Sequence, residues 1–282
     1  MTQVHIVTDS NCNIPPSLCH ELDIHVVPLP FVLDGVTYIE GVDIGPKGIF
    51  PLLRTAKSMP TTSAPTPGAF KETFDRLAAN RGPVLAILVG RQFSSTYVTA
   101  QMAKELLPDV DLTLIDSKSN AMALGFQVLA VARAAKQGRG LVELISIAQQ
   151  AMGATGILFS VKDLEYPYRG GRIGRVQRFL GGALNLYPIL EIRGAPIESI
   201  QPARSAQKAM SRLLDLAEQR MVRGRPYRLA ILHADNEKGA KMLQAAAQER
   251  FDPEEMILSE LSPVLTIHVG PGALGVAYCS GI

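Results

Sequence analysis

The sequence predicts an α/β protein with two domains: a doubly wound, mostly parallel sheet over residues 1–154, then an α+β domain with a mixed sheet over residues 155–282. Short apolar runs alternate with helix-period segments through about residue 154. After residue 155, strand-like runs lie in adjacent pairs near the end, which favours a mixed sheet. The 282 residues, 47% of them hydrophobic, also exceed the ~100 to 200 residues usual for one domain.

Four apolar runs of strand length predict the buried sheet of the first domain. A continuous apolar run is typical of a strand that is covered on both faces. The runs are Val4–Val7, Ile24–Leu33, Val84–Val89 and Leu112–Ile115. Because ligands of doubly wound sheets bind at the carboxyl ends of the strands, the loops after these runs are the first place to look for a site.

Amphipathic helices are predicted between these strands. One begins at Pro67 with Thr66 as its N-cap, and Phe70, Phe74 and Leu77 follow at i, i+4 and i+7. The same apolar spacing recurs in two later segments, at Val98, Met102 and Leu106, and at Leu124, Val128, Val131 and Ala135 before Gly138.

Further apolar runs predict the strands of the second domain. They are Ile157–Val161, Ile189–Ile192, Leu229–His233, Met256–Leu261, Leu265–Val269 and Leu274–Tyr278. Helices are predicted at about 205–221 and 237–250, on one face of the mixed sheet.

Composition argues against several classes of protein. Lys and Arg number 28 against 26 Asp and Glu, and this formal charge of +2 is too balanced for a protein whose main task is to follow a polyanion. Cys12, Cys19 and Cys279 lack the paired spacing of zinc and redox sites, so we expect reduced thiols in a cytoplasmic protein. The five histidines show no ligand spacing either, so no metal is expected.

No segment predicts a membrane span. The most apolar stretch, Ala121–Ala135, is interrupted by Gln127 and Arg133 and is shorter than the ~18 residues that a span needs. Residues Met1–Ser10 lack the basic and apolar regions of a secretory signal. A soluble protein is therefore expected.

Two hydroxyl clusters are candidate binding sites. Thr61, Thr62 and Ser63 lie in a proline-bounded stretch, for which a plain loop is the alternative. Ser94 and Ser95 follow an apolar strand and open a helix, so free backbone N–H groups there favour an anion. The alternative is an ordinary serine N-cap.

A basic, glycine-rich segment is a third candidate. Arg169 and Arg172 flank a glycine pair, and Arg175 and Arg178 continue the basic face. The order G-x-G-x-x-G of dinucleotide loops is absent. The arginines are compatible with RNA or phosphate, but the aromatic platform typical of RNA modules is missing, so a solvated edge or a protein docking patch is preferred.

His268 lies near a predicted strand end, before a turn centred on Pro271 and Gly272. An imidazole suits a carboxyl group at neutral pH, although a lone histidine is more often structural. Asp9–Ser10 and Asp116–Ser117 place further polar groups after strands, with helix capping as their alternative.

Six segments taken together resemble the DegV family in order and spacing, across essentially the whole chain. They are Val7–Ser10, Pro60–Ser63, Ser94–Tyr97, Ile115–Ser117, Gly170–Ile173 and His268–Gly272. The resemblance implies a two-domain fold with a long-chain fatty acid in a tunnel between the domains, and a role that is not enzymatic. In the better understood members, the carrier presents the carboxyl group to a separate ATP-dependent fatty acid kinase, and the acyl phosphate enters phospholipid synthesis.

The resemblance also implies which residues hold the ligand. The carboxylate would be held by the hydroxyl groups and by the segment around the histidine, namely Thr61, Thr62 or Ser63, Ser94 or Ser95, and His268 with Gly270. Arg169 and Arg172 would lie near the mouth. The chain departs from the family pattern at Ser95, commonly Gly, at Gly90, commonly Ser, and at Arg169 and Tyr187, commonly Lys.

Two other functions stay open from the residues alone. A serine hydrolase acting on lipid-like esters would use Ser94 as nucleophile, His268 as base, and Asp9 or Asp116 as orienter, although no G-x-S-x-G surrounds Ser94. An RNA-associated regulatory module would use the arginines of the glycine-rich segment. Acyl-chain length and unsaturation preference depend on how the tunnel packs.

Overall fold

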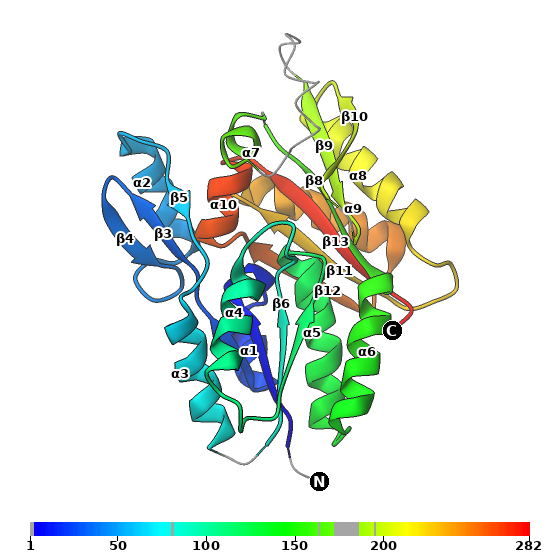
Figure 1. The fold of residues 1–282 in the computed structure, drawn as a ribbon. Helices are drawn as coiled ribbons and strands as arrows, with labels where there is room; N and C mark the ends of the chain where they lie inside the picture. Colours follow the sequence, from blue (N-terminus) through cyan, green and yellow to red (C-terminus); the bar gives the residue numbers. More distant parts are fainter. Residues whose placement is uncertain (1–2, 80–81, 163, 172–185, 195) are drawn as a thin grey trace.

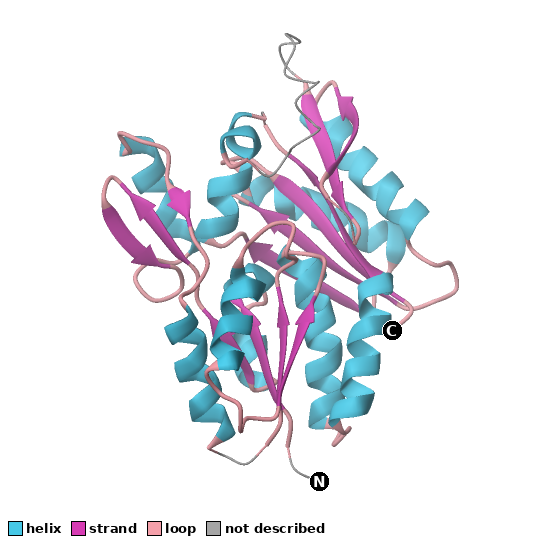
Figure 2. Cartoon of the chain, viewed as in Figure 1, coloured by secondary structure: helices cyan, strands magenta, loops and turns pink. Residues whose placement is uncertain are grey.

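The protein is described by a computed structural model at residues 3–79, 82–162, 164–171, 186–194 and 196–282. Two large sheets and one small sheet are covered by helices (Figures 1 and 2). This architecture confirms the predicted mixed α/β class.

The first sheet is four-stranded and parallel, in the order β2-β1-β6-β7. Its strands are β1 (His5–Asp9), β2 (Ile24–Val27), β6 (Val84–Leu88) and β7 (Leu112–Asp116). The helices of this half of the chain are η1 (Ser10–Cys12), α1 (Pro16–Glu21), η2 (Pro46–Gly48), α2 (Ile49–Thr55), α3 (Pro67–Ala78), α4 (Thr96–Glu105), α5 (Ala121–Lys136) and α6 (Leu141–Ala154).

Both faces of the first sheet are buried, which explains its continuous apolar runs. Val7 and Leu88 pack in one core with residues of α3 and α4, whereas Ile6 and Leu85 belong to a larger core that includes α5. The sheet is therefore doubly wound, as predicted.

The second sheet is six-stranded and mixed, in the order β10-β9-β8-β13-β11-β12. Only β11 and β12 pair in parallel. The strands are β8 (Thr155–Ser160), β9 (Tyr187–Ile192), β10 (Glu198–Ala203), β11 (Tyr227–His233), β12 (Glu255–Glu260) and β13 (Leu274–Ser280). The helices among the described residues of this half are α7 (Glu165–Arg169), α8 (Ala206–Arg220), α9 (Glu237–Phe251) and α10 (Pro263–Val269).

Helix α5 joins the two large sheets. It contacts β1 and β6 on one side and β8 and β13 on the other, while α8 and α9 cover the opposite face of the second sheet. The second sheet begins at Thr155, where the sequence analysis divides the chain. We retain 1–154 and 155–282 as proposed domains that share α5 as a common wall.

The segment Ile24–Leu33, predicted as one strand, forms two strands in different sheets. After β2, the chain leaves the first sheet and enters a small antiparallel sheet of order β4-β3-β5. Its strands are β3 (Pro30–Leu33), β4 (Val36–Ile39) and β5 (Thr61–Thr62). The prediction was wrong because Pro28 and Pro30 lack the N–H groups that a continuous ladder needs.

Residues Leu265–Val269, predicted as a strand, form most of helix α10. The Ser262 side chain accepts a hydrogen bond from the Leu265 N–H, and Pro263 occupies the first turn. The prediction was wrong because Leu265, Thr266 and Ile267 form a continuous buried run within the helix. Periodicity does not separate a helix from a strand in such a run.

Helix α4 turns a different face to the core from the one predicted. Val98, Met102 and Leu106 are 42%, 50% and 58% exposed, whereas Ala100 and Ala103 are fully buried. The small alanine side chains let α4 lie close to α3 and β7, so its larger apolar residues point outward.

Candidate functional site

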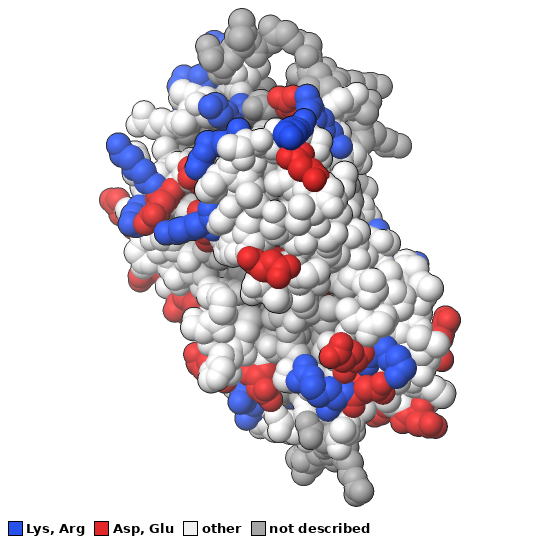
Figure 3. Space-filling model, turned by 90° about the vertical axis from the view of Figure 1, so that its left-hand side faces the viewer, with Lys and Arg blue, Asp and Glu red and all other residues white. Residues whose placement is uncertain are grey.

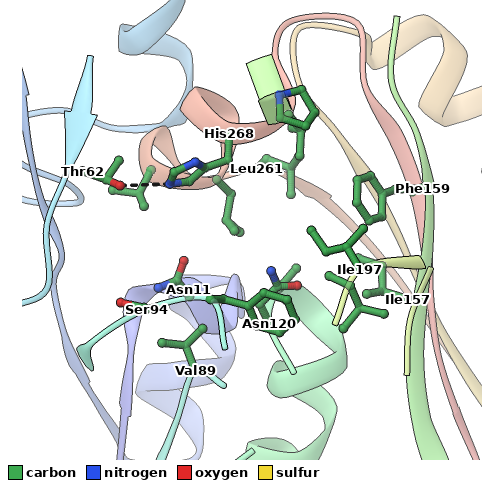
Figure 4. A pocket seen from close by; sticks show the side chains of 18 of the residues that line it. Asn11, Thr62, Val89, Ser94, Asn120, Ile157, Phe159, Ile197, Leu261 and His268 are labelled. Atoms are coloured by element: carbon green, nitrogen blue, oxygen red, sulfur yellow. Dashed lines mark hydrogen bonds between the residues drawn. The ribbon is translucent and has the colours of Figure 1, made fainter. Parts of the chain in front are cut away.

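A cavity lies between the two large sheets, at the carboxyl ends of β1, β6 and β7 (Figure 4). Together with the open space at its mouth, the cavity has a volume of about 1060 Å³. Strands β8, β11 and β13 and helix α10 supply the opposite wall. The position agrees with the rule that ligands of doubly wound sheets bind beyond the carboxyl ends of the strands.

One end of the cavity is apolar. Ile157 and Phe159 of β8 point into it beside Ile197 (Figure 4). Leu232 of β11 and Ile192 of β9 complete this wall, and both are almost fully buried. The side chains named here offer a ligand no hydrogen bond, so this end favours an apolar group.

The other end carries a hydroxyl–imidazole pair. Thr62 Oγ1 of β5 lies 2.9 Å from His268 Nε2 of α10, and both side chains face the cavity (Figure 4). Thr61 and Thr62 point to opposite faces of β5, so Thr62 lines the cavity whereas Thr61 is exposed and lies outside its lining. Ser63, directly after β5, also lines the cavity.

Gly270 shapes the polar end through its backbone. Its φ is +78°, and a Cβ atom there would lie 2.5 Å from the ring of Tyr166. A Cβ at Gly170 would likewise lie 2.6 Å from Nδ1 of His268. These two glycines therefore allow α7 and α10 to pack closely around the imidazole.

Ser94 and Ser95 also line the cavity, below the Thr62–His268 pair. Ser94 Oγ lies 2.7 Å from Thr96 Oγ1 and accepts a hydrogen bond from the Thr96 N–H at 3.2 Å. Ser94 thus supports the start of α4 while its hydroxyl faces the cavity. Ser95 is the N-cap residue of α4, but its side chain makes no cap hydrogen bond.

We expect Ser94→Ala to lower both ligand affinity and stability. Loss of the helix-start hydrogen bond costs ~1 kcal/mol of stability, and loss of a donor to a carboxylate costs ~1.5 to 3 kcal/mol of binding. Thr66→Ala is the matched control, since Thr66 caps α3 outside the cavity lining and accepts from the Ala69 N–H. Denaturant melts and fatty acid titrations on both variants separate the roles. If both variants lose the same fatty acid affinity, Ser94 is not a ligand-binding residue.

The basic segment is described only in part. Arg169 is exposed at the end of α7 and pairs with Glu165 at 2.6 Å, while Pro167 of the same helix lines the cavity. Arg169 therefore lies on an element that borders the cavity. Arg172 lies outside the described residues, as do Arg175 and Arg178.

Sequence reasoning missed two polar lining residues, Asn11 and Asn120. Asn11 lies in η1 directly after β1, and Asn120 precedes α5 after β7. Both side chains point into the cavity in Figure 4. The sequence could have indicated both asparagines, because the neighbouring pairs Asp9–Ser10 and Asp116–Ser117 show that these strand ends are polar.

Asp9 lies beneath the cavity as a completely buried carboxyl group. It accepts hydrogen bonds from the N–H groups of Val89, at 2.7 Å, and Asn11, at 3.0 Å. Burial raises the pKa of Asp9 to about 6, although these hydrogen bonds oppose the change. Asp9 therefore holds together the two loops that follow β1 and β6.

We expect Asp9→Asn to remove part of the pH dependence of stability. An unperturbed aspartate has a pKa of 3.8, against about 6 for Asp9 in the folded protein. The folded state thus binds more protons between about pH 4 and 6, and the stability from this group falls by ~3 kcal/mol as pH rises through that window. Urea unfolding from pH 4 to 7 should show the wild type losing stability relative to the variant. Parallel curves would contradict this prediction.

Other chemistry finds little support in the described part of the chain. No three His, Cys, Asp or Glu side chains there gather as a possible metal site. The thiols of Cys12, Cys19 and Cys279 are free, and burial raises the pKa of Cys19 and of Cys279 to about 11. No helix among these residues is long and apolar enough to cross a membrane.

The groups required by a hydrolase are engaged in other interactions. His268 Nε2 lies against Thr62, and the hydroxyl of Ser94 lies against the neighbouring threonine. Asp9 and Asp116 accept hydrogen bonds from backbone N–H groups. This arrangement favours a site that binds a polar group over a Ser-His-Asp triad.

On the face drawn in Figure 3, the described basic and acidic side chains lie close together at the upper and lower ends, with a largely uncharged area between them that carries acidic side chains near its centre. A surface that follows a nucleic acid backbone would instead present a continuous basic stripe.

Comparison with known proteins agrees with the cavity. Residues 3–281 match a family model described as an uncharacterised protein of the DegV family. The chain belongs to the DegV family. A DegV domain-containing protein of Caldanaerobacter subterraneus subsp. tengcongensis is 32% identical over 278 residues, which cover 99% of each chain.

Solved structures of DegV proteins share the whole fold. A DegV family protein from Thermus thermophilus, described by its fatty acid binding, has a TM-score of 0.91 and 30% identity, with 99% of each chain covered. DegV of Bacillus subtilis, described as a fatty acid binding protein, has a TM-score of 0.90 and 28% identity, again with 99% of each chain covered. The DegV fold predicted from the sequence is therefore confirmed.

In this DegV chain, the departures at Ser95 and Gly90 lie at the polar end of the cavity. Ser95 lines it directly. Gly90 accepts hydrogen bonds from the N–H groups of Phe93 and Ser94, and a Cβ there would lie 2.8 Å from the Gln92 amide. A serine at position 90 would thus require the flexible Gln92 side chain to move.

Proposed function

We propose that this protein binds one long-chain fatty acid, with the acyl chain in the apolar end of the cavity and the carboxylate at Thr62 and His268. The observation that carries the proposal is the polarity of the cavity, which has an apolar wall at one end and a hydroxyl–imidazole pair at the other. Fatty acid binding by the related DegV proteins supports it.

The acyl chain and the carboxylate contribute differently to the proposed binding free energy. Each buried methylene contributes ~0.8 kcal/mol, so about sixteen carbons supply on the order of 10 kcal/mol before association costs. The carboxylate is unfavourable to bury unless donors meet it. Ser63, Ser94, Ser95 and Asn120 also line the cavity and offer further donors.

We further propose that the protein is a cytoplasmic carrier without its own catalytic activity. In this proposal it presents the carboxyl group of the fatty acid to an ATP-dependent fatty acid kinase, and the kinase forms an acyl phosphate. With the tail enclosed and the head group at the polar end, a kinase needs access only to the carboxyl oxygens. The exposed Arg169 of α7, next to the cavity-lining Pro167, is the candidate docking contact on this side.

Purified protein is expected to carry a fatty acid at close to one molecule per chain. Native mass spectrometry, followed by lipid extraction and chromatography, measures the stoichiometry and the chain length together. Delipidated protein that fails to bind saturated and monounsaturated fatty acids at micromolar concentration would overturn the proposal. Saturable ester turnover abolished by Ser94→Ala would instead favour the hydrolase.

A further inference from the structure

Helix α10, which carries His268, is attached at its start to side chains from the first half of the chain. The Ser262 N–H donates to Asn13 Oδ1 and the Val264 N–H donates to Glu40 Oε2, both at 2.8 Å. Backbone N–H groups in a first helical turn have no partner within the helix. Asn13 and Glu40 therefore satisfy donors that α10 leaves open.

Glu40 is the centre of this attachment. It follows β4, is only 2% exposed, and accepts a hydrogen bond from the Ser10 hydroxyl as well as from Val264. Ser10 in turn accepts from the Leu29 N–H at 2.9 Å. A buried carboxylate is unfavourable unless such donors surround it, so this network ties β4, η1 and α10 together.

Burial raises the pKa of Glu40 to about 6, which the hydrogen bonds from Ser10, Val264 and Ser262 oppose. The negative charge of the buried Asp9 carboxylate also raises the pKa of Glu40. Burial raises the pKa of the Cys12 thiol, and Glu40 in turn raises it further. In the described part of the chain Glu40 forms no ion pair, so hydrogen-bond donors stabilise its charge there.

The small sheet holds α10 at two points. Glu40 follows its strand β4 and binds the helix at Val264, while Thr62 of its strand β5 meets the helix at His268. Val264 and His268 are four residues apart, so they lie on the same face of the helix. Figure 1 shows α10 beside β5. A rotation or shift of α10 at Val264 would thus move His268 relative to Thr62.

We propose that Glu40 is a positioning residue for the carboxyl-binding pair: by fixing the start of α10, it sets the imidazole of His268 against Thr62. Its effect on the ligand rests on the proposed function, whereas its effect on the imidazole does not. Glu40 is absent from the cavity lining, so it acts through the helix.

Glu40→Gln tests this inference in protein without lipid. Glutamine keeps the shape but replaces one acceptor oxygen by a donor, so it does not accept from both Ser10 and Val264. We expect the side-chain ¹⁵N resonances of His268, assigned with His268→Gln, to change in chemical shift because the contact between Thr62 and the imidazole changes. Glu191→Gln is the matched control, because Glu191 is also a buried carboxylate but pairs with Arg220 outside the cavity lining.

Unchanged His268 resonances in folded Glu40→Gln would overturn the inference. If that variant does not fold, Ser10→Ala removes one donor from the same carboxylate and must give the same change. Titration with oleic acid is the second measurement. We expect the affinity of Glu40→Gln for oleic acid to be about tenfold lower than that of the wild type, which corresponds to the loss of one hydrogen bond of ~1.4 kcal/mol. If the wild type binds no fatty acid while the resonances change, the proposed function fails and the positioning role stands.

Discussion

His268→Ala is expected to lower acyl phosphate formation by about a hundredfold, while fatty acid affinity falls about tenfold. The acyl chain supplies most of the binding free energy, so loss of one head-group contact has a limited effect on affinity. The kinase, in contrast, depends on the orientation of the reacting oxygen, and misplacement by about 1 Å reduces a rate by about 10²-fold.

The measurement pairs a kinase assay, using a fatty acid kinase from the same source, with lipid titration and a melting curve. Thr62→Val is the companion variant, because it keeps the β-branched shape of β5 and removes the Oγ1 atom beside His268. It should give an intermediate loss of rate. Normal phosphorylation without His268 would refute the assignment of the carboxyl site, even if lipid binding persists.

Ile157→Phe is expected to shorten the acyl chain that the cavity accepts. Ile157 points into the apolar end from β8 (Figure 4), and a larger ring there displaces the tail of a long ligand. Each methylene that is excluded removes ~0.8 kcal/mol, about fourfold in affinity. Displacement of about two carbons thus lowers affinity for an eighteen-carbon acid about fifteenfold, with little change for a twelve-carbon acid.

Titration with saturated acids of ten to eighteen carbons tests this prediction. Leu158→Phe is the matched control, because Leu158 follows on the same strand but packs in the core on the opposite face of the sheet. That variant should lose stability without any change in chain-length preference. If Ile157→Phe folds and keeps the wild-type preference, the acyl chain does not reach this wall.

Local sequence patterns were sufficient to predict the class of the fold and the polar residues that follow the strands of the first sheet. Continuous apolar runs predicted β1, β6 and β7 because both faces of this sheet are covered. The cap at Thr66 and the spacing of Phe70 and Phe74 predicted α3, because capping and periodicity are local properties. The hydroxyls near Thr62 and Ser94 and the imidazole of His268 were also marked as candidates.

Which of these groups come into contact depends on tertiary packing. Thr62 and His268 are 206 residues apart, and they face each other because Glu40, which follows β4, fixes the start of α10 beside β5. No local pattern encodes that attachment, and the buried run of α10 itself was predicted as a strand. Contacts distant in sequence depend on packing that forms only when both halves of the chain enclose the cavity, so residue spacing does not reveal them.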